Sequence, residues 1–206
     1  AIPDADWRKH SWLDPEREDY YPYKFAGNEA DKDDFLNGMP AARDYQALKF
    51  RPAQGECSDF NVGNAGDFCM MRIEEMYFIE AEAMYHLEPA EGVKLLQDFI
   101  KDYRYSSYDR ISAGADENAF LTELLLQKRI EFWGEGILFF DYKRLNQGIT
   151  RGYNGTNFPA VARFNTDGRS PQWNVVITRS ESQSNTALNQ ELNNPDPTEL
   201  LVPWSE

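Results

Sequence analysis

Residues 128–144 read KRIEFWGEGILFFDYKR, and this stretch is the most informative part of the sequence. Its charged residues alternate with large aromatic ones, so it cannot be a simple solvated face and is expected to lie against a core. Gly134 and Gly136 predict the end of a helix, because glycine is a poor helix former. The aromatic run that follows Gly136 predicts a short further helix.

The acidic residues of this stretch are predicted to be structural. A carboxylate that lies among apolar side chains needs a cation or several N–H donors. Arg129 and Arg144 are the nearest cations in the sequence, so we expect these residues or backbone amides to bind Glu135 and Asp141. Glu131 and Glu135 lie four residues apart on one helix face, which favours structural ion pairs. Two catalytic carboxylates of a glycosidase would instead flank the substrate from two sides.

The chain before this stretch is predicted to be helical. Apolar residues recur at three- and four-residue spacing over residues 71–86 and again over 93–103. Pro89 suits an early helical position, where its missing N–H costs little. Because few residues join these two helices, we expect them to pack antiparallel as a hairpin. A third helix is predicted from near Asp116 into residues 128–144. The aromatic residues expected in the core are Tyr77, Phe78, Phe99 and Phe139.

Long irregular segments are expected on either side of the helices. Prolines punctuate residues 1–68, and Asn-Gly and Asp-Gly pairs predict turns in residues 148–206. The best candidate for a strand is residues 174–178. The sequence therefore predicts a mostly α protein of tetratricopeptide-like helical hairpins, with a helical core at residues 69–147, long irregular loops and little sheet.

The composition excludes several classes of function. The chain has 21 basic and 35 acidic residues and a formal net charge of −14, a balance that repels nucleic acids and anionic lipids. No apolar run is long enough to span a bilayer. His10 and His86 are the only histidines and lie in no zinc motif, so neither a metal nor another cofactor is expected. Cys57 and Cys69 could pair or remain thiols, and the sequence leaves both alternatives open.

Three blocks of the sequence resemble the SusD/RagB family, the surface glycan-binding lipoproteins of Bacteroidetes. Residues 72–83, RIEEMYFIEAEA, resemble the family helix R-x-A-E-M-Y-L-I-A-A-E-A. Residues 128–144 resemble E-R-R-I-E-L-x-x-E-G-x-R-x-x-D-L-R-R-W, although Leu138 replaces the usual arginine. Residues 175–190 resemble the closing stretch, with Thr178 in place of the usual proline. The residues expected to form the structural motif are Arg72, Glu75, Glu82, Arg129, Glu131, Glu135, Gly136, Asp141 and Arg144.

The resemblance implies both a fold and a function. It identifies residues 1–206 as the C-terminal region of a longer protein with a SusD-like α-α superhelix. It implies a non-enzymatic protein on the outer surface of the outer membrane, held by a lipid anchor upstream of this chain. Such a protein binds oligosaccharide or another nutrient and delivers it to a SusC-like TonB-dependent transporter. A helical-repeat scaffold that binds a protein and no sugar is the alternative, and a glycosidase is a third possibility.

Aromatic residues in the loop-like N-terminal segment are the candidates for glycan binding. Sugars stack their C–H faces on tryptophan and tyrosine rings, while neighbouring polar side chains bind the hydroxyl groups. For each of these residues, packing over the helices is the competing interpretation. The candidates are Trp7, Trp12, Tyr20, Tyr21 and Tyr23, with Trp173 and Trp204 as weaker ones.

Overall fold

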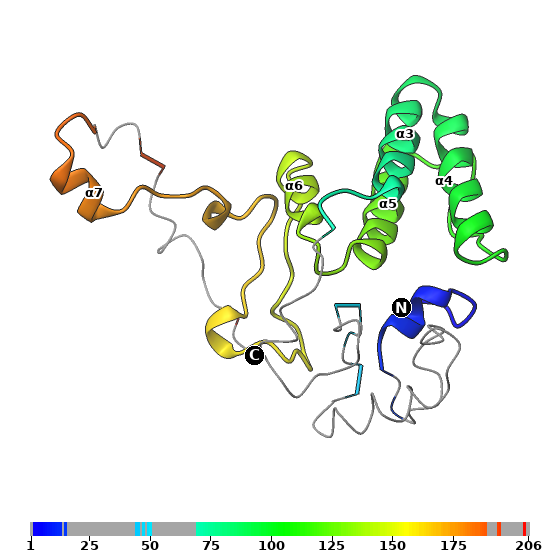
Figure 1. Cartoon of the computed structure of the whole chain (residues 1–206), viewed down its shortest axis with the longest axis horizontal. Helices are drawn as coiled ribbons and strands as arrows, with labels where there is room; N and C mark the ends of the chain where they lie inside the picture. Colours follow the sequence, from blue (N-terminus) through cyan, green and yellow to red (C-terminus); the bar gives the residue numbers. More distant parts are fainter. Residues whose placement is uncertain are drawn as a thin grey trace. The chain divides into compact units, whose positions relative to one another are not determined.

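The protein is mostly α-helical in the part of the chain that the structure, a computed structural model, describes (Figure 1). The described residues are 2–13, 15, 44–45, 47, 49–50, 69–188, 193–194 and 204. They form the helices α3 (Ile73–Leu87), α4 (Pro89–Tyr103), α5 (Glu117–Glu131), α6 (Ile137–Arg144) and α7 (Arg179–Ser184) and the 3-10 helices η1 (Trp7–Ser11), η2 (Ala160–Ala162) and η3 (Pro171–Trp173). The β pairing among these residues is limited to two isolated bridges, Trp12–Ala47 and Thr150–Asn165. The predicted fold class is confirmed.

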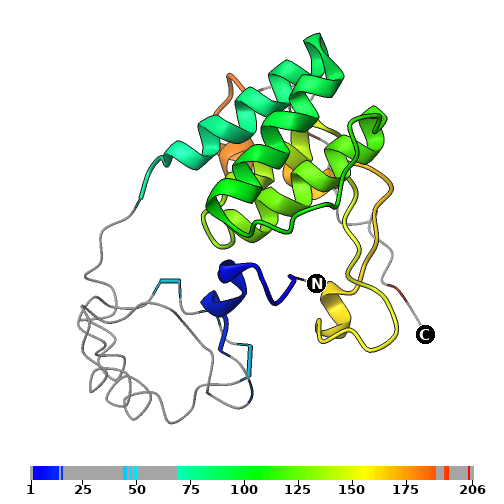
Figure 2. The ribbon, with the colours of Figure 1, turned by 90° about the vertical axis from the view of Figure 1, so that its right-hand side faces the viewer.

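The chain divides into two compact units, residues 1–131 and residues 132–206. In the first unit, α3 and α4 form the predicted antiparallel hairpin and lie side by side in both views (Figure 2). Glu88 alone separates the two helices. Its N–H donates to the Met84 carbonyl (2.7 Å) and ends α3, and its own carbonyl accepts from the Gly92 N–H (3.1 Å) in the first turn of α4. Pro89 opens α4, as its position in the sequence predicts.

The two helices of the hairpin cross closely at Gly92. A Cβ atom at this position would lie 2.4 Å from the backbone of Tyr85 on α3, so no side chain fits there. Tyr85 in turn stacks on Phe120 of α5, with ring centroids 4.1 Å apart and an interplanar angle of 9°. Asp116 begins α5 by accepting a hydrogen bond from the Ala119 N–H (2.8 Å), close to the predicted start of this helix.

The core of the first unit lies between α3, α4 and α5. Each fully buried apolar side chain stabilises the fold by about 1.5–3 kcal/mol before the entropy cost. The buried apolar side chains of these three helices are Phe78, Ala81, Tyr85, Val93, Leu96, Phe99, Ile100, Phe120, Leu124 and Leu125.

Two of the four aromatic residues expected in the core lie at the surface. Phe78 and Phe99 are buried, but Tyr77 on α3 is 37% exposed and Phe139 on α6 is 42% exposed. The prediction for these two residues is wrong because both helices carry apolar side chains on more than one face. On α3 the face that turns inward includes Phe78 and the carboxylate-bearing Glu82, and the apolar residues on the opposite side remain exposed.

In the second unit, glycines shape the turn before α6. Gly134 (φ 78°) and Gly136 (φ 80°) adopt the left-handed conformation that side-chain-bearing residues disfavour. The turn follows α5 directly and places Gly136 as the N-cap of α6, so the prediction that these glycines end one helix before another is confirmed.

The predicted strand at residues 174–178 is wrong. Asparagine side chains, rather than a neighbouring strand, bind the backbone here. Asn193 accepts from the Ile177 N–H (2.8 Å) and donates to the Ile177 carbonyl (3.0 Å), and Asn194 donates to the Val175 carbonyl (2.6 Å). The short helix α7 follows at once.

Candidate functional site

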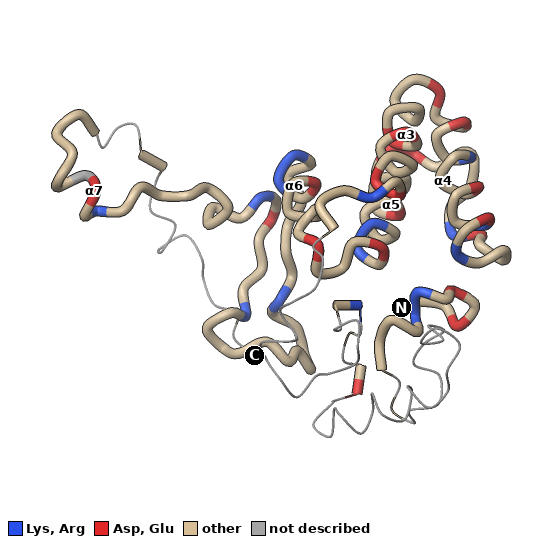
Figure 3. Tube along the Cα trace, viewed as in Figure 1, with Lys and Arg blue, Asp and Glu red and all other residues tan. Residues whose placement is uncertain are grey.

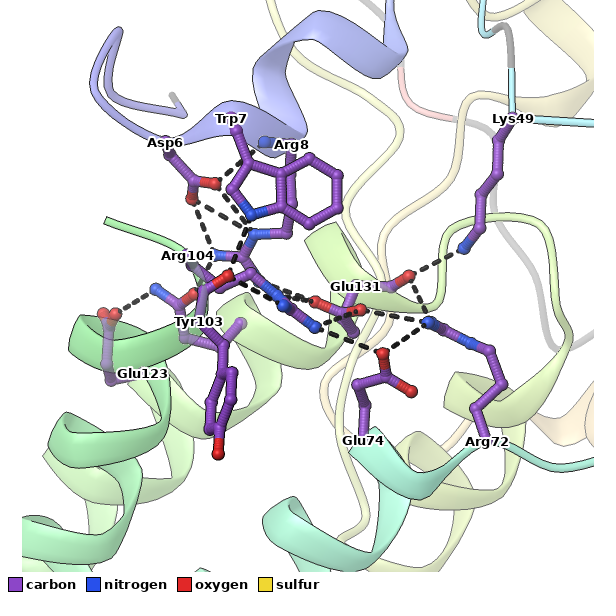
Figure 4. A network of polar contacts seen from close by, with 11 residues as sticks. Asp6, Trp7, Arg8, Lys49, Arg72, Glu74, Tyr103, Arg104, Glu123 and Glu131 are labelled. Atoms are coloured by element: carbon purple, nitrogen blue, oxygen red, sulfur yellow. Dashed lines mark hydrogen bonds and ion pairs between the residues drawn. The ribbon is translucent and has the colours of Figure 1, made fainter. Parts of the chain in front are cut away.

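Glu131, the last residue of α5, accepts hydrogen bonds from three arginines in the first unit (Figure 4). Arg104 donates to both carboxylate oxygens, from Nε to Oε2 (2.8 Å) and from Nη2 to Oε1 (2.9 Å). Arg8 donates to Oε2 (3.2 Å) and Arg72 to Oε1 (3.1 Å). Glu131 is only 5% exposed, so this paired carboxylate lies within the fold.

The backbone carbonyl of Glu131 is bound as well. Arg72 Nη2 lies 2.9 Å from this oxygen and Lys49 Nζ lies 2.7 Å from it. The last carbonyls of a helix have no partner within the helix and carry the negative end of its dipole, so cations are favourable there. The two cations therefore stabilise the C-terminal end of α5.

Arg8 connects the N-terminal segment to α5. Asp6, the N-cap of η1, accepts hydrogen bonds from the Arg8 Nε (2.9 Å) and Nη2 (2.6 Å) atoms. Arg8 Nη2 also donates to Gln127 Oε1 (2.6 Å), and Gln127 Nε2 donates to Glu123 Oε1 (2.7 Å). All four side chains are buried. Asp6, Arg8, Glu123, Gln127 and Glu131, with Arg72 and Arg104, are called the Glu131 cluster below.

The far end of the Glu131 cluster is Glu123. Its Oε1 accepts from the Tyr108 hydroxyl (3.0 Å) and from Arg110 Nε (3.1 Å). Burial raises the pKa of Tyr108, and the adjacent carboxylate raises it further. Tyr108 therefore remains a protonated hydrogen-bond donor at physiological pH.

The surroundings of Glu131 keep its carboxylate ionised. Burial would raise the pKa of Glu131, but the hydrogen bonds and charge of Arg104, together with the charges of Arg8 and Arg72, hold it below its ordinary value. A general acid or base works best with a pKa near the operating pH. This electrostatic setting favours a structural role for Glu131 over acid–base catalysis.

An aromatic cluster adjoins Arg104 at the edge of the hairpin. Trp7 donates its indole N–H to the Tyr103 carbonyl (2.9 Å). The Arg104 guanidinium lies 5.3 Å from the Trp7 ring centroid and 4.9 Å from that of Phe99. The rings of Tyr77 and Tyr103 both contact Phe99, at centroid distances of 5.0 and 5.7 Å, and lie 5.8 Å from each other. Trp7, Tyr77, Phe99 and Tyr103 are called the hairpin-edge cluster below.

The structure places two of the five glycan-binding candidates. Trp7 is half-buried in the hairpin-edge cluster, and Trp12 is half-buried and forms a bridge with Ala47. Tyr20, Tyr21 and Tyr23 lie outside the described residues. Sequence reasoning did not include Tyr77 and Tyr103 among the candidates, because their helical spacing is also the signature of core residues. The contact of Trp7 with the Tyr103 carbonyl spans 96 positions of the chain and has no local sequence signal.

The structure also places the ion pair between Asp141 and Arg144 in the second unit and the two weaker glycan-binding candidates. Arg144 donates to Asp141 Oδ1 from Nε (3.0 Å) and Nη2 (2.8 Å), and Asp141 is buried. Trp173 is half-buried and packs edge-on against Phe139, at a centroid distance of 5.7 Å. Trp204 is half-buried, and its side chain lies where a Cβ on Gly152 would have to be.

The remaining motif residues have varied surroundings. Arg72 binds Glu131, as described above. Glu75 is half-buried and Glu82 is buried, both on α3. Arg129 is exposed on α5, and Glu135 is half-buried in the turn before α6. The arginines that bind the Glu131 carboxylate, Arg8, Arg72 and Arg104, thus come from distant parts of the chain rather than from its sequence neighbours.

Within the described residues, no group of three or more histidine, cysteine, aspartate or glutamate side chains is arranged to hold a metal ion. Likewise, none of the helices described has the length and apolarity needed to cross a membrane. The acidic and basic residues are interspersed along α4 and α5, whereas α3 carries glutamates and neither lysine nor arginine (Figure 3). Cys69 is an exposed free thiol, and Cys57 lies outside the described residues.

Comparison with known proteins identifies a family. The model of the SusD family matches residues 17–201 of this chain. No curated protein and no solved structure shows significant similarity to the chain.

Proposed function

Because the chain belongs to the SusD family, we propose that it binds oligosaccharide or another nutrient at the cell surface and catalyses no reaction. The observation that carries this proposal is the family match, which extends over residues 17–201 of a 206-residue chain. Proteins of this family are binding proteins. The strongly paired carboxylate of Glu131 is consistent with a structural use of the family motif.

The proposal includes a partner and a location. The protein would stand on the outer face of the outer membrane, held by a lipid anchor. It would deliver its ligand to a SusC-like TonB-dependent transporter. The formal net charge of −14 argues against nucleic acid as a partner, because like charges repel.

The proposed ligand contacts are the aromatic residues of the N-terminal segment. Trp7 and Trp12 are both half-buried, so each retains some surface at the solvent. The same role is proposed for Tyr20, Tyr21 and Tyr23. Aromatic rings of this kind bind the apolar faces of sugar rings.

Calorimetric titration of the full-length protein with neutral oligosaccharides tests the proposal. We expect saturable binding of at least one series among malto-, cello-, xylo- and mannohexaose, with no shortening of the sugar on prolonged incubation. Release of shorter sugars would show a glycosidase and overturn the non-enzymatic assignment. A transporter that co-purifies from the native membrane would support the proposed partner.

A helical-repeat scaffold is the second candidate function. It is favoured by the apolar side chains that α3 exposes, Met76, Ile79 and Leu87, since such residues commonly mark protein contacts. Absence of binding to every sugar in the titration, together with retention of the transporter, would favour the scaffold over the binding protein.

A further inference from the structure

We propose that Tyr77 and Tyr103 form a surface that binds the pyranose rings of a neutral oligosaccharide. This inference rests on the proposed function and assigns the ligand to one place on the hairpin of α3 and α4. It extends the predicted ligand contacts to two tyrosines that the sequence pattern had assigned to helices rather than to a binding surface.

The two tyrosines present ring surface to the solvent. Tyr103 is 53% exposed and Tyr77 is 37% exposed. Both lie where the first turns of α3 meet the last turn of α4. Aromatic rings with a free face are the groups on which sugars stack.

The exposed rings rest on a buried one. Phe99 is only 5% exposed and lies within 5.7 Å of both tyrosine rings, and the Tyr77 ring is inclined to it by only 26°. A side chain that is already ordered loses little entropy when it binds a ligand. The contacts with Phe99 therefore order the tyrosine rings before a sugar binds, which lowers the entropy cost of binding.

The Glu131 cluster fixes this edge of the hairpin from within. The Arg104 guanidinium lies 5.3 Å from the Trp7 ring centroid and 4.9 Å from that of Phe99, while its Nε and Nη2 atoms donate to Glu131. The Tyr103 ring points away from Glu131 (Figure 4), and the Tyr103 carbonyl accepts from Trp7. The charged side chains thus face inward and leave the aromatic rings at the surface.

The hydroxyl groups of the two tyrosines are suited to sugar hydroxyls. A hydrogen bond with Tyr103 and the charge interaction between the two phenols raise the pKa of Tyr77. The Tyr77 phenol therefore remains protonated and neutral at physiological pH. A phenol can both donate and accept a hydrogen bond, which matches the hydroxyl groups of a pyranose.

The charges near the surface favour a neutral sugar over an acidic one. Arg104 is paired with Glu131 and lies 3.5 Å from Glu74, so its positive charge is offset. The negative charges of Glu80 and Glu74 both act on Tyr77. A uronic acid bound here would meet these carboxylates, and like charges at short range are unfavourable.

Five tyrosine variants test the assignment. We expect Tyr77→Ala, Tyr103→Ala and the double variant to bind the hexasaccharide of the wild type at least roughly tenfold more weakly. Tyr77→Phe and Tyr103→Phe keep the ring and are expected to retain most of the affinity. Hexagalacturonic acid is expected to bind more weakly than the neutral hexasaccharide.

Phe140→Ala is the matched control, because Phe140 lies on α6 and is 69% exposed. We expect it to bind like the wild type, and circular dichroism would verify that each variant is folded. Unchanged affinity in the folded double variant would overturn this inference and leave the proposed function standing. Failure of the wild type to bind any sugar would overturn both, and equal binding of the acidic sugar would overturn the preference for a neutral ligand.

Discussion

Arg104 binds both carboxylate oxygens of Glu131, with Nε 2.8 Å from Oε2 and Nη2 2.9 Å from Oε1. The two hydrogen bonds run from one guanidinium to one carboxylate, the geometry in which an arginine pair is strongest. Because Arg104 follows α4 and Glu131 ends α5, the pair joins two helices of the first unit. The contribution of this pair to the free energy of unfolding can be measured by substitution.

We expect Glu131→Gln to destabilise the folded protein by about 3–5 kcal/mol, since it leaves buried cations without their carboxylate. Chemical denaturation followed by circular dichroism would measure the change in the free energy of unfolding. Asp98→Asn is the matched control, because Asp98 pairs with Lys94 on an exposed face of α4 and should contribute at most about 1 kcal/mol. Equal effects of the two substitutions would contradict the structural role of Glu131.

The pKa of Glu131 predicts how stability depends on pH. Its folded-state pKa is lowered, so the unfolded chain takes up a proton more readily as the pH falls. The stabilisation is therefore complete above the ordinary glutamate pKa of about 4.3 and is lost as the pH falls through the lower folded-state value. The free energy of unfolding should fall less steeply across this window in Glu131→Gln than in the wild type. Parallel pH profiles for the two proteins would argue against this assignment.

Arg8→Ala is expected to release the N-terminal segment from α5. The substitution removes the partner of three buried groups, the side chains of Asp6, Gln127 and Glu131. Hydrogen exchange read by mass spectrometry should show the amides of residues 6–13 exchanging at least roughly tenfold faster. Lys9→Ala, which removes an exposed ion pair with Asp4, should leave their exchange unchanged. Equal protection of the amides of residues 6–13 from exchange in both variants would show that Arg8 does not hold the N-terminal segment on α5.

Gly92→Ala tests the close crossing of α3 and α4. The added Cβ would meet the Tyr85 backbone at 2.4 Å, so the helices must move apart at a cost of about 1–3 kcal/mol. Gly114→Ala is the control, because nothing lies within 4 Å of a Cβ there, and its effect should be about 0.5 kcal/mol or less. The melting temperatures of the two variants are compared with that of the wild type. A melting temperature unchanged by Gly92→Ala would mean that the hairpin tolerates a wider crossing.

The helices could be predicted because their signals are local. Pro89, the glycines around Glu135 and the apolar spacing of residues 93–103 each lie within the element that they specify. The buried face of α3 could not be chosen in the same way. Apolar residues occupy more than one side of this helix, and the side that is buried is the one that packs on the neighbouring helices, where Phe78 contacts Phe99 of α4 (centroid distance 5.1 Å).

The contacts of the candidate site escaped prediction for a different reason. The sequence indicated that Glu131 forms structural ion pairs, but Arg8, Arg72 and Arg104 are far from it in the chain. Local charge spacing carries no information on such partners. The prediction of a strand at residues 174–178 was wrong for a similar reason. Backbone groups that would pair with a neighbouring strand are instead bound by the side chains of Asn193 and Asn194.

The separation of Arg8 from Glu131 along the chain has a consequence for the order of folding. The two residues are 123 positions apart, whereas a single residue joins α3 to α4. Closing a long loop costs more entropy than closing a short one, so contacts between sequence neighbours form sooner. During synthesis, moreover, Arg8 emerges well before the ribosome has made the carboxylate that it binds. We therefore expect the N-terminal segment to join the folded helices as a late event, after residue 131 has left the ribosome.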